Sequence, residues 1–120
     1  MKTSDALTEI RSLIATQDRW LRFSYAQDED GAECEPIDPL ACSFCLAGAR
    51  VWAKENIPGV GDTHKEQIFH IQEAIAEYTP VLVAGIISSV AFNDHDDTTH
   101  EDVLAVLDRA IENARLLEST

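Results

Sequence analysis

Residues 91–104, A-F-N-D-H-D-D-T-T-H-E-D-V-L, combine five Asp or Glu carboxylates with two histidines in fourteen positions. Carboxylates and imidazoles are ligands that zinc, manganese and non-haem iron accept from proteins. A metal site in this stretch would use Asp94, His95, Asp96 and His100. One hypothesis is therefore a small metal-dependent enzyme or metal-binding protein built on the Asp94/His100 region.

The order of these residues matches no established metal motif. An EF-hand counted from Asp94 needs Gly at its sixth position and an acid at its twelfth, where this chain has Thr99 and Ala105. His95 and His100 lie five positions apart, so H-E-x-x-H is absent as well. The segment instead predicts a capped turn that leads into a helix, and we expect this turn to bind no metal.

In that interpretation Thr99 is the N-cap of a terminal helix. We expect its hydroxyl to accept a hydrogen bond from the amide of Glu101 or Asp102. Asp94 should accept bonds from free backbone amides of the same turn, as Asp commonly does. The ring of His100, in the first helical turn, should tuck toward the domain.

Three cysteines, Cys34, Cys42 and Cys45, form a second candidate cluster. A C-x-x-C pair alone is weakly specific, because structural zinc sites need a second ligand pair at suitable spacing. A redox motif would place the pair at a helix N-terminus after a core strand, whereas this sequence predicts it inside a helix. We expect reduced, structural thiols, with Cys42 and Cys45 in or against the core. Zinc binding and redox chemistry are the alternatives.

Glu66, His70, Glu73 and Glu77 share one stripe of another predicted helix. Di-iron bundles use Glu-x-x-His on two helices, whereas the local order here is His70-x-x-Glu73 and no second helix supplies a matching pair. The stripe predicts a solvated acidic face. No nucleophile elbow, Walker loop or dinucleotide-binding loop occurs, so the sequence predicts no catalytic residues and no cofactor.

The elements that would position these side chains are mostly helices. Apolar residues recur at helical spacing in three segments, whereas L-R-F-S-Y alternates ahead of an Asp30-Gly31 turn. A further apolar segment suits either a strand or a buried helix, and we expect a helix because no comparable partner strands exist elsewhere. We predict a mainly α, single compact domain of four to five helices, with one short β-hairpin near residues 21–35. The expected helices span residues 4–17, 39–56, 63–78, 80–92 and 100–117.

Start signals precede most of these helices. Ser4 should cap the first, Asp38 followed by Pro39 should open the second, and Thr63 with Glu66 should form a capping box for the third. The terminal helix should bury an apolar stripe of Val103, Leu107, Ala110, Ile111 and Ala114.

Length and charge narrow the function classes. A chain of 120 residues predicts one globular domain, residues 1–120. The net charge of −13 disfavours nucleic acid and anionic membranes, which both attract Lys and Arg. The sequence predicts no membrane span and no secretory signal, and the odd number of cysteines fits reduced thiols, so we expect a cytoplasmic protein.

F-C-L-A-G-A at residues 44–49 and the stretch from residue 91 to 111 resemble a family of short uncharacterised bacterial and phage proteins. The family pattern is W-C-x-x-G-A followed by F-N-D, a short turn, T-H-x-x-V and a terminal helix. Phe44 stands where the family commonly has Trp, and His95-Asp96-Asp97 where small residues or Pro-Gly are usual. The resemblance implies an α-rich fold and transfers no catalytic residues. It highlights the positions Cys45, Gly48, Asn93, Asp94, Thr99 and His100.

The leading hypothesis is a non-enzymatic binding or protein-interaction domain of bacterial or phage origin. The acidic surface and the missing catalytic constellation both favour it. Its partner would be another protein or a second copy of the chain. Stoichiometric metal in the purified protein would instead favour the metal-dependent alternative.

Overall fold

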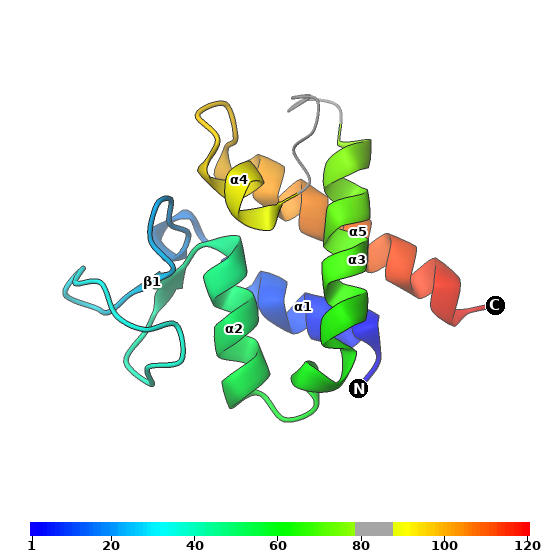
Figure 1. Cartoon of the computed structure of the whole chain (residues 1–120), viewed down its shortest axis with the longest axis horizontal. Coiled ribbons are helices and arrows are strands. Elements are labelled where there is room, and N and C mark those ends of the chain that lie inside the picture. Colours follow the sequence, from blue (N-terminus) through cyan, green and yellow to red (C-terminus); the bar gives the residue numbers. More distant parts are fainter. Residues whose placement is uncertain (79–87) are drawn as a thin grey trace.

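The computed structural model describes residues 1–78 and 88–120, in which helices dominate (Figure 1). Helices make up 61% of the described residues, which confirms the predicted mainly α class. Two short 3-10 turns, η1 and η2, and a two-stranded antiparallel sheet complete the described elements. In chain order these elements are α1 (Thr3–Leu13), η1 (Gln17–Arg19), β1 (Ala26–Gln27), β2 (Ser43–Phe44), α2 (Leu46–Asn56), η2 (Val60–Thr63), α3 (His64–Glu77), α4 (Ser89–Asp94) and α5 (His100–Glu118).

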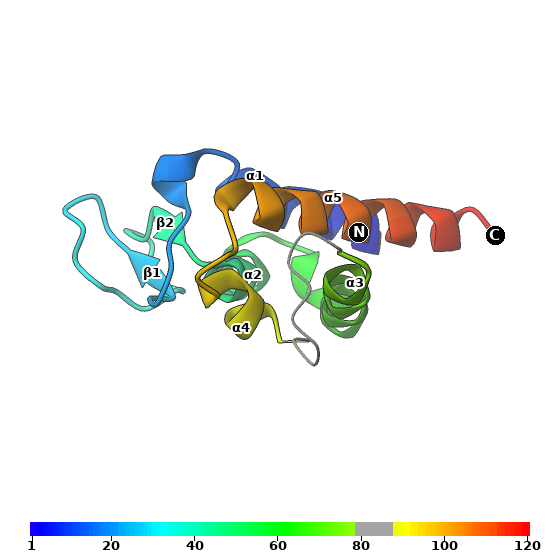
Figure 2. The same ribbon diagram turned by 90° about the horizontal axis from the view of Figure 1, so that it is seen from above.

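The helices lie in two layers. Figure 2 shows α1 and α5 side by side in one layer, with α2, α3 and α4 in the other. The predicted apolar stripe of α5 is buried between the layers, together with Val106. The Cα radius of gyration is 13.5 Å, which is the value of a compact globule of this length. No helix in the described ranges is long and apolar enough to cross a bilayer.

The helix expected over residues 80–92 lies largely outside the described residues. Its end is described, as α4, and begins at Ser89. The hydroxyl of Ser88 caps this short helix by accepting a bond from the amide of Ala91. The preceding residues, 79–87, are not described.

The prediction that Ser4 caps α1 is wrong. The helix begins one residue earlier, with Lys2 at the N-cap position and no side-chain cap. Ser4 is buried instead, and both its amide and its hydroxyl donate to the carboxylate of Glu118, at 3.0 and 2.6 Å. An N-cap hydroxyl accepts a hydrogen bond from an amide of its own helix, whereas Ser4 donates to the carboxylate of a residue 114 positions away.

The predicted capping box of α3 does not form. The chain enters α3 directly from η2, so Thr63 lacks the extended backbone of an N-cap and makes no side-chain cap bond. Its hydroxyl accepts from Nε2 of Gln67 at 3.1 Å. The same Nε2 donates to the carbonyl of Val60 at 2.7 Å. The buried amide of Gln67 therefore joins η2 to α3.

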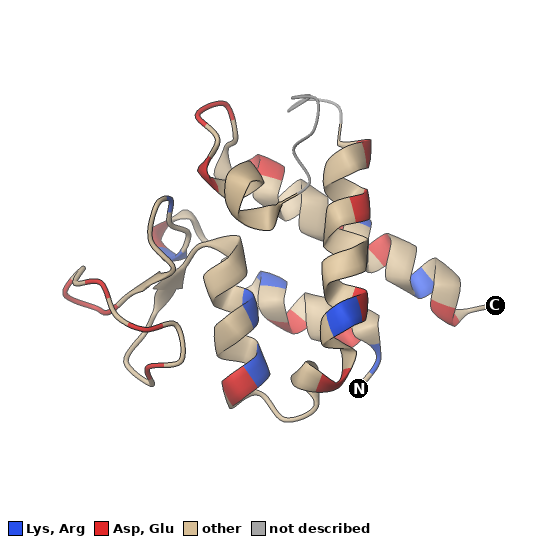
Figure 3. Cartoon of the chain, viewed as in Figure 1, with Lys and Arg blue, Asp and Glu red and all other residues tan. Residues whose placement is uncertain are grey.

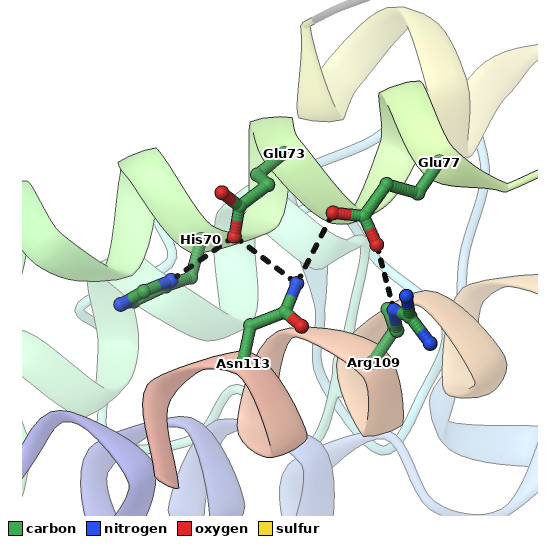
Figure 4. Close-up of polar contacts among 5 residues, drawn as sticks. All are labelled: His70, Glu73, Glu77, Arg109 and Asn113. Atoms are coloured by element: carbon green, nitrogen blue, oxygen red, sulfur yellow. Dashed lines mark hydrogen bonds and ion pairs between the residues drawn. The ribbon is translucent and has the colours of Figure 1, made fainter. Parts of the chain in front are cut away.

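The stripe predicted as a solvated face of α3 instead lies largely along α5 (Figure 4). His70 is buried, with Nδ1 3.5 Å from Glu73, beyond good hydrogen-bond distance. The amide of Asn113 donates to Glu73 at 3.0 Å. Arg109 donates to Glu77 at 2.6 Å. The predicted solvated face therefore holds for Glu66 and Glu77, which are exposed, and is wrong for buried His70 and half-buried Glu73, because the local pattern does not contain the position of α5.

The helix predicted from residue 39 to 56 ends as expected but begins only at Leu46. The carboxylate of Asp38 accepts the amide of Leu40 at 2.9 Å, which makes a turn rather than a helix start. Cys42 then donates its amide to the carbonyl of Gln27 at 3.0 Å, because this part of the chain pairs with β1. The expected placement of Cys42 and Cys45 inside a helix is therefore wrong.

The short antiparallel hairpin is confirmed, although its strands are β1 and β2. Asp28 to Gly31 form the predicted tight turn, in which Gly31 has a φ of 79°. The chain that returns from this turn makes one isolated bridge, between Glu33 and Gln27. The strand that pairs with β1 is β2, residues 43–44. Cys34 lies on this return, with its amide bonded to the carbonyl of Ala26.

Candidate functional site

The loop between η1 and β1, residues 20–25, projects an aromatic side chain into solvent. Phe23 is 72% exposed, and its φ of 65° is the only positive value of a non-glycine residue in the described ranges. That conformation costs a non-glycine residue about 1–2 kcal/mol, because Cβ approaches the following carbonyl. Contacts from distant parts of the chain must therefore hold the loop in place.

Asn93 provides the central contact. The residue is fully buried at the end of α4, and its Oδ1 accepts from the indole of Trp20 at 2.7 Å and from the amide of Leu46 at 3.1 Å. Its Nδ2 donates to the carbonyl of Leu21 at 2.8 Å and to Oδ1 of Asp94 at 3.0 Å. One side-chain amide thus joins the loop, the start of α2 and the end of α4.

Asp94 holds the strained residue itself. Its Oδ1 accepts the amide of Phe23 at 3.0 Å. The expectation that Asp94 would accept bonds from backbone amides of its own turn is wrong. Its Oδ1 accepts instead from the amide of Phe23, in the loop, and from the side-chain amide of Asn93. A charged acceptor makes the stronger kind of hydrogen bond, which suits a position that must offset backbone strain.

Gly48, in the first turn of α2, lets the chain approach closely at the end of the loop. A Cβ on this residue would lie 1.8 Å from the carbonyl oxygen of Tyr25, far inside van der Waals contact. The same carbonyl accepts the amide of Cys45 at 3.3 Å. Only glycine fits here without moving the backbone of the loop.

Cys45 is the N-cap of α2, and its Sγ accepts the amide of Gly48 at 3.3 Å. The side chain is buried, as expected, whereas Cys42 is only half-buried. Burial raises the pKa of the Cys45 thiol, and the charge of Asp94 adds to that rise. A neutral, enclosed thiol is a structural cap rather than a nucleophile. All three cysteines are free.

Thr99 caps α5, and His100, the first residue of that helix, contacts the loop. The hydroxyl of Thr99 accepts the amide of Asp102 at 3.2 Å, and the carboxylate of Asp102 accepts the amide of Thr99 at 2.8 Å, which confirms the predicted cap as a full capping box. His100 tucks inward as predicted, with Nε2 2.6 Å from the carbonyl of Ile14. Its ring lies against Trp20, with 5.7 Å between ring centroids.

The residues of the hypothetical metal site do not face one another, and three of the four bond to different parts of the chain. Asp94 faces Phe23, His100 faces Ile14, and Nδ1 of His95 accepts the amide of Asp97 at 3.1 Å. Within residues 1–78 and 88–120, no three His, Cys, Asp or Glu side chains are grouped to hold a metal ion. Asp96 is exposed, and its side chain makes no hydrogen bond with another of the described residues.

Five of the six highlighted positions therefore contact one loop. The sixth, Thr99, caps the helix whose first residue is His100. The sequence missed Phe23, because L-R-F-S-Y alternates like a strand and nothing local signals a left-handed phenylalanine. A hollow of about 90 Å³ lies beside it. Ligand pockets for small molecules hold roughly 300–1,000 Å³, so this surface suits contact with another molecule better than enclosure of a substrate. The hollow is lined by Phe23, Ser24, Tyr25, Cys45, Val90 and Asp94.

Comparison with known families finds one match over most of the chain. Residues 1–113 match the model of DUF6197, described as a family of unknown function. This match confirms the resemblance to such a family that the sequence indicated. No curated protein and no solved structure is detectably similar to the chain.

Proposed function

The chain belongs to the family of unknown function DUF6197, and we propose that it is a non-enzymatic interaction domain that binds a basic partner protein through the loop around Phe23. The observation that supports this proposal is the exposed, left-handed Phe23 held by Asp94. Strained backbone persists where the surrounding structure enforces it, and such positions cluster at binding sites. Enforced exposure of an aromatic ring is expected of an interface anchor.

A second aromatic side chain is exposed beside Phe23. Tyr25 is 53% exposed and lines the same hollow as Phe23, and we term these two side chains the Phe23 surface. Aromatic residues of this kind are enriched at the centres of protein interfaces. Ile37 and Leu40, in the loop that joins β1 to β2, are 51% and 68% exposed.

Acidic residues follow the Phe23 surface in the sequence and point to a basic partner, with Arg22 the one basic residue inside the loop of residues 20–25. The loops between β1 and β2 carry six acids and no Lys or Arg, and Figure 3 shows them as the red segments at the left. With a net charge of −13, a second copy would be repelled, whereas a basic protein would be attracted. The six acids are Asp28, Glu29, Asp30, Glu33, Glu35 and Asp38.

We also propose a cytoplasmic location, bacterial or phage origin, one domain over residues 1–120 and no resident cofactor. The free thiols of Cys34, Cys42 and Cys45 support the location, because cytoplasmic cysteines are normally reduced. The motif resemblance supports the origin.

Site-specific photocrosslinking tests the proposed surface. A photoreactive phenylalanine analogue at position 23 should trap a partner in cells, whereas the same analogue at Phe69 should not. Phe69 is a matched control because it is also an exposed phenylalanine, 58% exposed, on α3. The trapped protein should be basic, and its affinity should fall with salt.

Purified components then give the decisive result. Phe23→Ala should weaken binding of the trapped protein by about thirtyfold or more, as loss of an interface anchor does, and Phe69→Ala should not. Equal effects of the two variants would contradict the proposal. If position 23 traps only the chain itself and light scattering shows a dimer, the partner is a second copy. Stoichiometric metal in protein purified without chelator would favour the metal-dependent alternative.

A further inference from the structure

Away from the Phe23 surface, positively charged side chains gather where α2 leads into η2 and α3. Arg50 and Lys54 are one helical turn apart on α2, so they share a face. Arg50 reaches across to α3, where its Nη2 lies 3.2 Å from Nδ1 of His64. Figure 3 shows the blue segments of α2 in the half of the helix that leads to η2.

This cluster has no acidic partner. Within residues 1–78 and 88–120, no carboxylate lies within 4.0 Å of the charged nitrogens of Arg50 or Lys54, and residues 79–87 contain no Asp or Glu. Asp62, in the adjacent η2, is exposed and forms no ion pair. Of the nine Lys and Arg residues, Arg11 and Arg109 form ion pairs within the described ranges, so Arg50 and Lys54 are set apart by their position beside His64 and not by the missing carboxylate.

Arg50 is also partly withdrawn from water, whereas Lys54 is exposed. Arg50 is half-buried, and its Nε is buried without a hydrogen-bond partner. Burial lowers the pKa of Arg50. The stem of Lys54 packs over Gly61, with Cγ 3.3 Å from the place a Cβ would occupy. A half-buried charge without a counter-ion is costly, so the arrangement favours any anion that can reach it.

His64 is the third member of the cluster. Burial lowers its pKa, and the charges of Arg50 and Lys54 lower it further. A neutral ring accepts the Arg50 N–H at Nδ1 and so carries its own proton on Nε2, where it is a donor. His64 is also the first residue of α3, a helix of 14 residues whose positive end adds to the local potential.

We propose that Arg50, Lys54 and His64 form a binding site for a small oxyanion, a phosphate or a carboxylate group. The guanidinium and the ammonium supply charge, and the imidazole supplies a neutral donor. The acids elsewhere on the surface do not prevent binding, because repulsion between exposed charges is screened beyond about 8 Å at physiological salt.

The pKa of His64, followed by NMR with the resonance assigned through His64→Gln, tests this site. Inorganic phosphate at about 10 mM should raise that pKa by ~0.5 or more, because a bound anion favours the imidazolium. It should also raise Tm by about 2–5 °C, since a ligand that binds only the folded state stabilises it. Sodium chloride at the same ionic strength should do neither. Sodium acetate, compared at the same ionic strength, identifies a carboxylate ligand if it acts like phosphate.

Arg50→Gln should abolish both responses. Arg115→Gln is the matched control, because it removes the same charge from an exposed position on α5 and should leave both responses unchanged. If Arg50→Gln does not fold, Lys54→Gln replaces it and should weaken phosphate binding several-fold. The proposal is overturned if neither anion shifts the pKa of His64 beyond the chloride reference, or if the cluster variants respond like the wild type.

Discussion

The indole N–H of Trp20 donates to the side-chain oxygen of Asn93 at 2.7 Å, across 73 residues of sequence. Asn93 uses both ends of its amide in the same buried position, so four groups lose a partner if it is removed. Buried polar groups left unpaired cost about 1–3 kcal/mol each, and partial rearrangement reduces the sum. Loss of this single side chain should therefore destabilise the loop, the start of α2 and the end of α4 together.

Asn93→Ala should lower the free energy of unfolding by about 3 kcal/mol, measured by urea denaturation. Asn56→Ala is the control, because that exposed amide donates only to the carbonyl of Trp52 and should change stability by less than about 0.5 kcal/mol. Similar losses in the two variants would show that the buried network contributes little.

Gly48→Ala should destabilise the fold by more than about 3 kcal/mol, because the new methyl group would overlap the carbonyl of Tyr25 and displace the loop. Gly31→Ala is the comparison. Its Cβ would meet no atom within 4 Å, so only the left-handed backbone matters, at about 1–2 kcal/mol. Thermal denaturation of both variants gives the ranking, and a smaller loss at Gly48 would mean that the close approach is easily relaxed.

Thr99→Ala should cost about 0.5–2 kcal/mol, since it removes the hydroxyl that accepts the amide of Asp102. Asp96→Ala, in the exposed part of the same turn, should stay within about 0.5 kcal/mol of the wild type. Chemical denaturation with and without EDTA measures both variants. A metal site in the turn would instead make the wild type sensitive to EDTA and Asp96→Ala insensitive.

Tyr78 links stability to alkaline pH. Burial, together with the hydrogen bond that Tyr78 donates to Asp102 at 2.7 Å, raises its pKa to about 12. The folded state therefore favours the neutral phenol. The resulting stability is fully present below about pH 10, the ordinary tyrosine value, and is lost as pH rises through the folded pKa. Tyr78→Phe should show a shallower fall in unfolding free energy between about pH 10 and 12 than the wild type. Parallel slopes would contradict the assignment.

Cys45 should react with thiol reagents about tenfold more slowly than the half-buried Cys42, because its thiol is enclosed and burial raises its pKa. Mass spectrometry of the labelled peptides follows each site separately. The slow site should disappear in Cys45→Ala. Rapid labelling of Cys45 in the folded protein would mean that the cap of α2 opens readily.

The sequence predicted the elements whose signals are local. The apolar stripe of α5 and its capping box at Thr99 lie within one helix, so spacing and residue type were sufficient. Asp38 followed by Pro39 gave an equally good local signal, yet Asp38 forms only a turn, and pairing with β1 keeps residues 42–44 extended before α2 begins. Start signals thus failed where a partner from elsewhere in the chain took the same backbone groups.

For the same reason, the sequence identified the residues that support the candidate site but not the exposed residue that they hold. Its supports, Asn93 and Asp94 among them, stood out by motif resemblance, but their partners lie about 70 residues away in the sequence. Phe23 carried no signal at all, since its exposure depends on those distant bonds. His70 and Glu73 were assigned to solvent because a helical stripe shows which residues share a face but not what covers that face.

The pairing of α1 with α5 sets the order in which the chain can fold during synthesis. The apolar face of α1, with Ala6, Leu7 and Ile10, is covered in large part by α5, whose buried residues are made about 100 positions later. At roughly 5–20 residues per second, a ribosome needs about 5–20 s to supply that cover. For that interval α1 has only α2, η2 and α3 to pack against, and the part of its apolar face that α5 will cover is open to recognition by a chaperone.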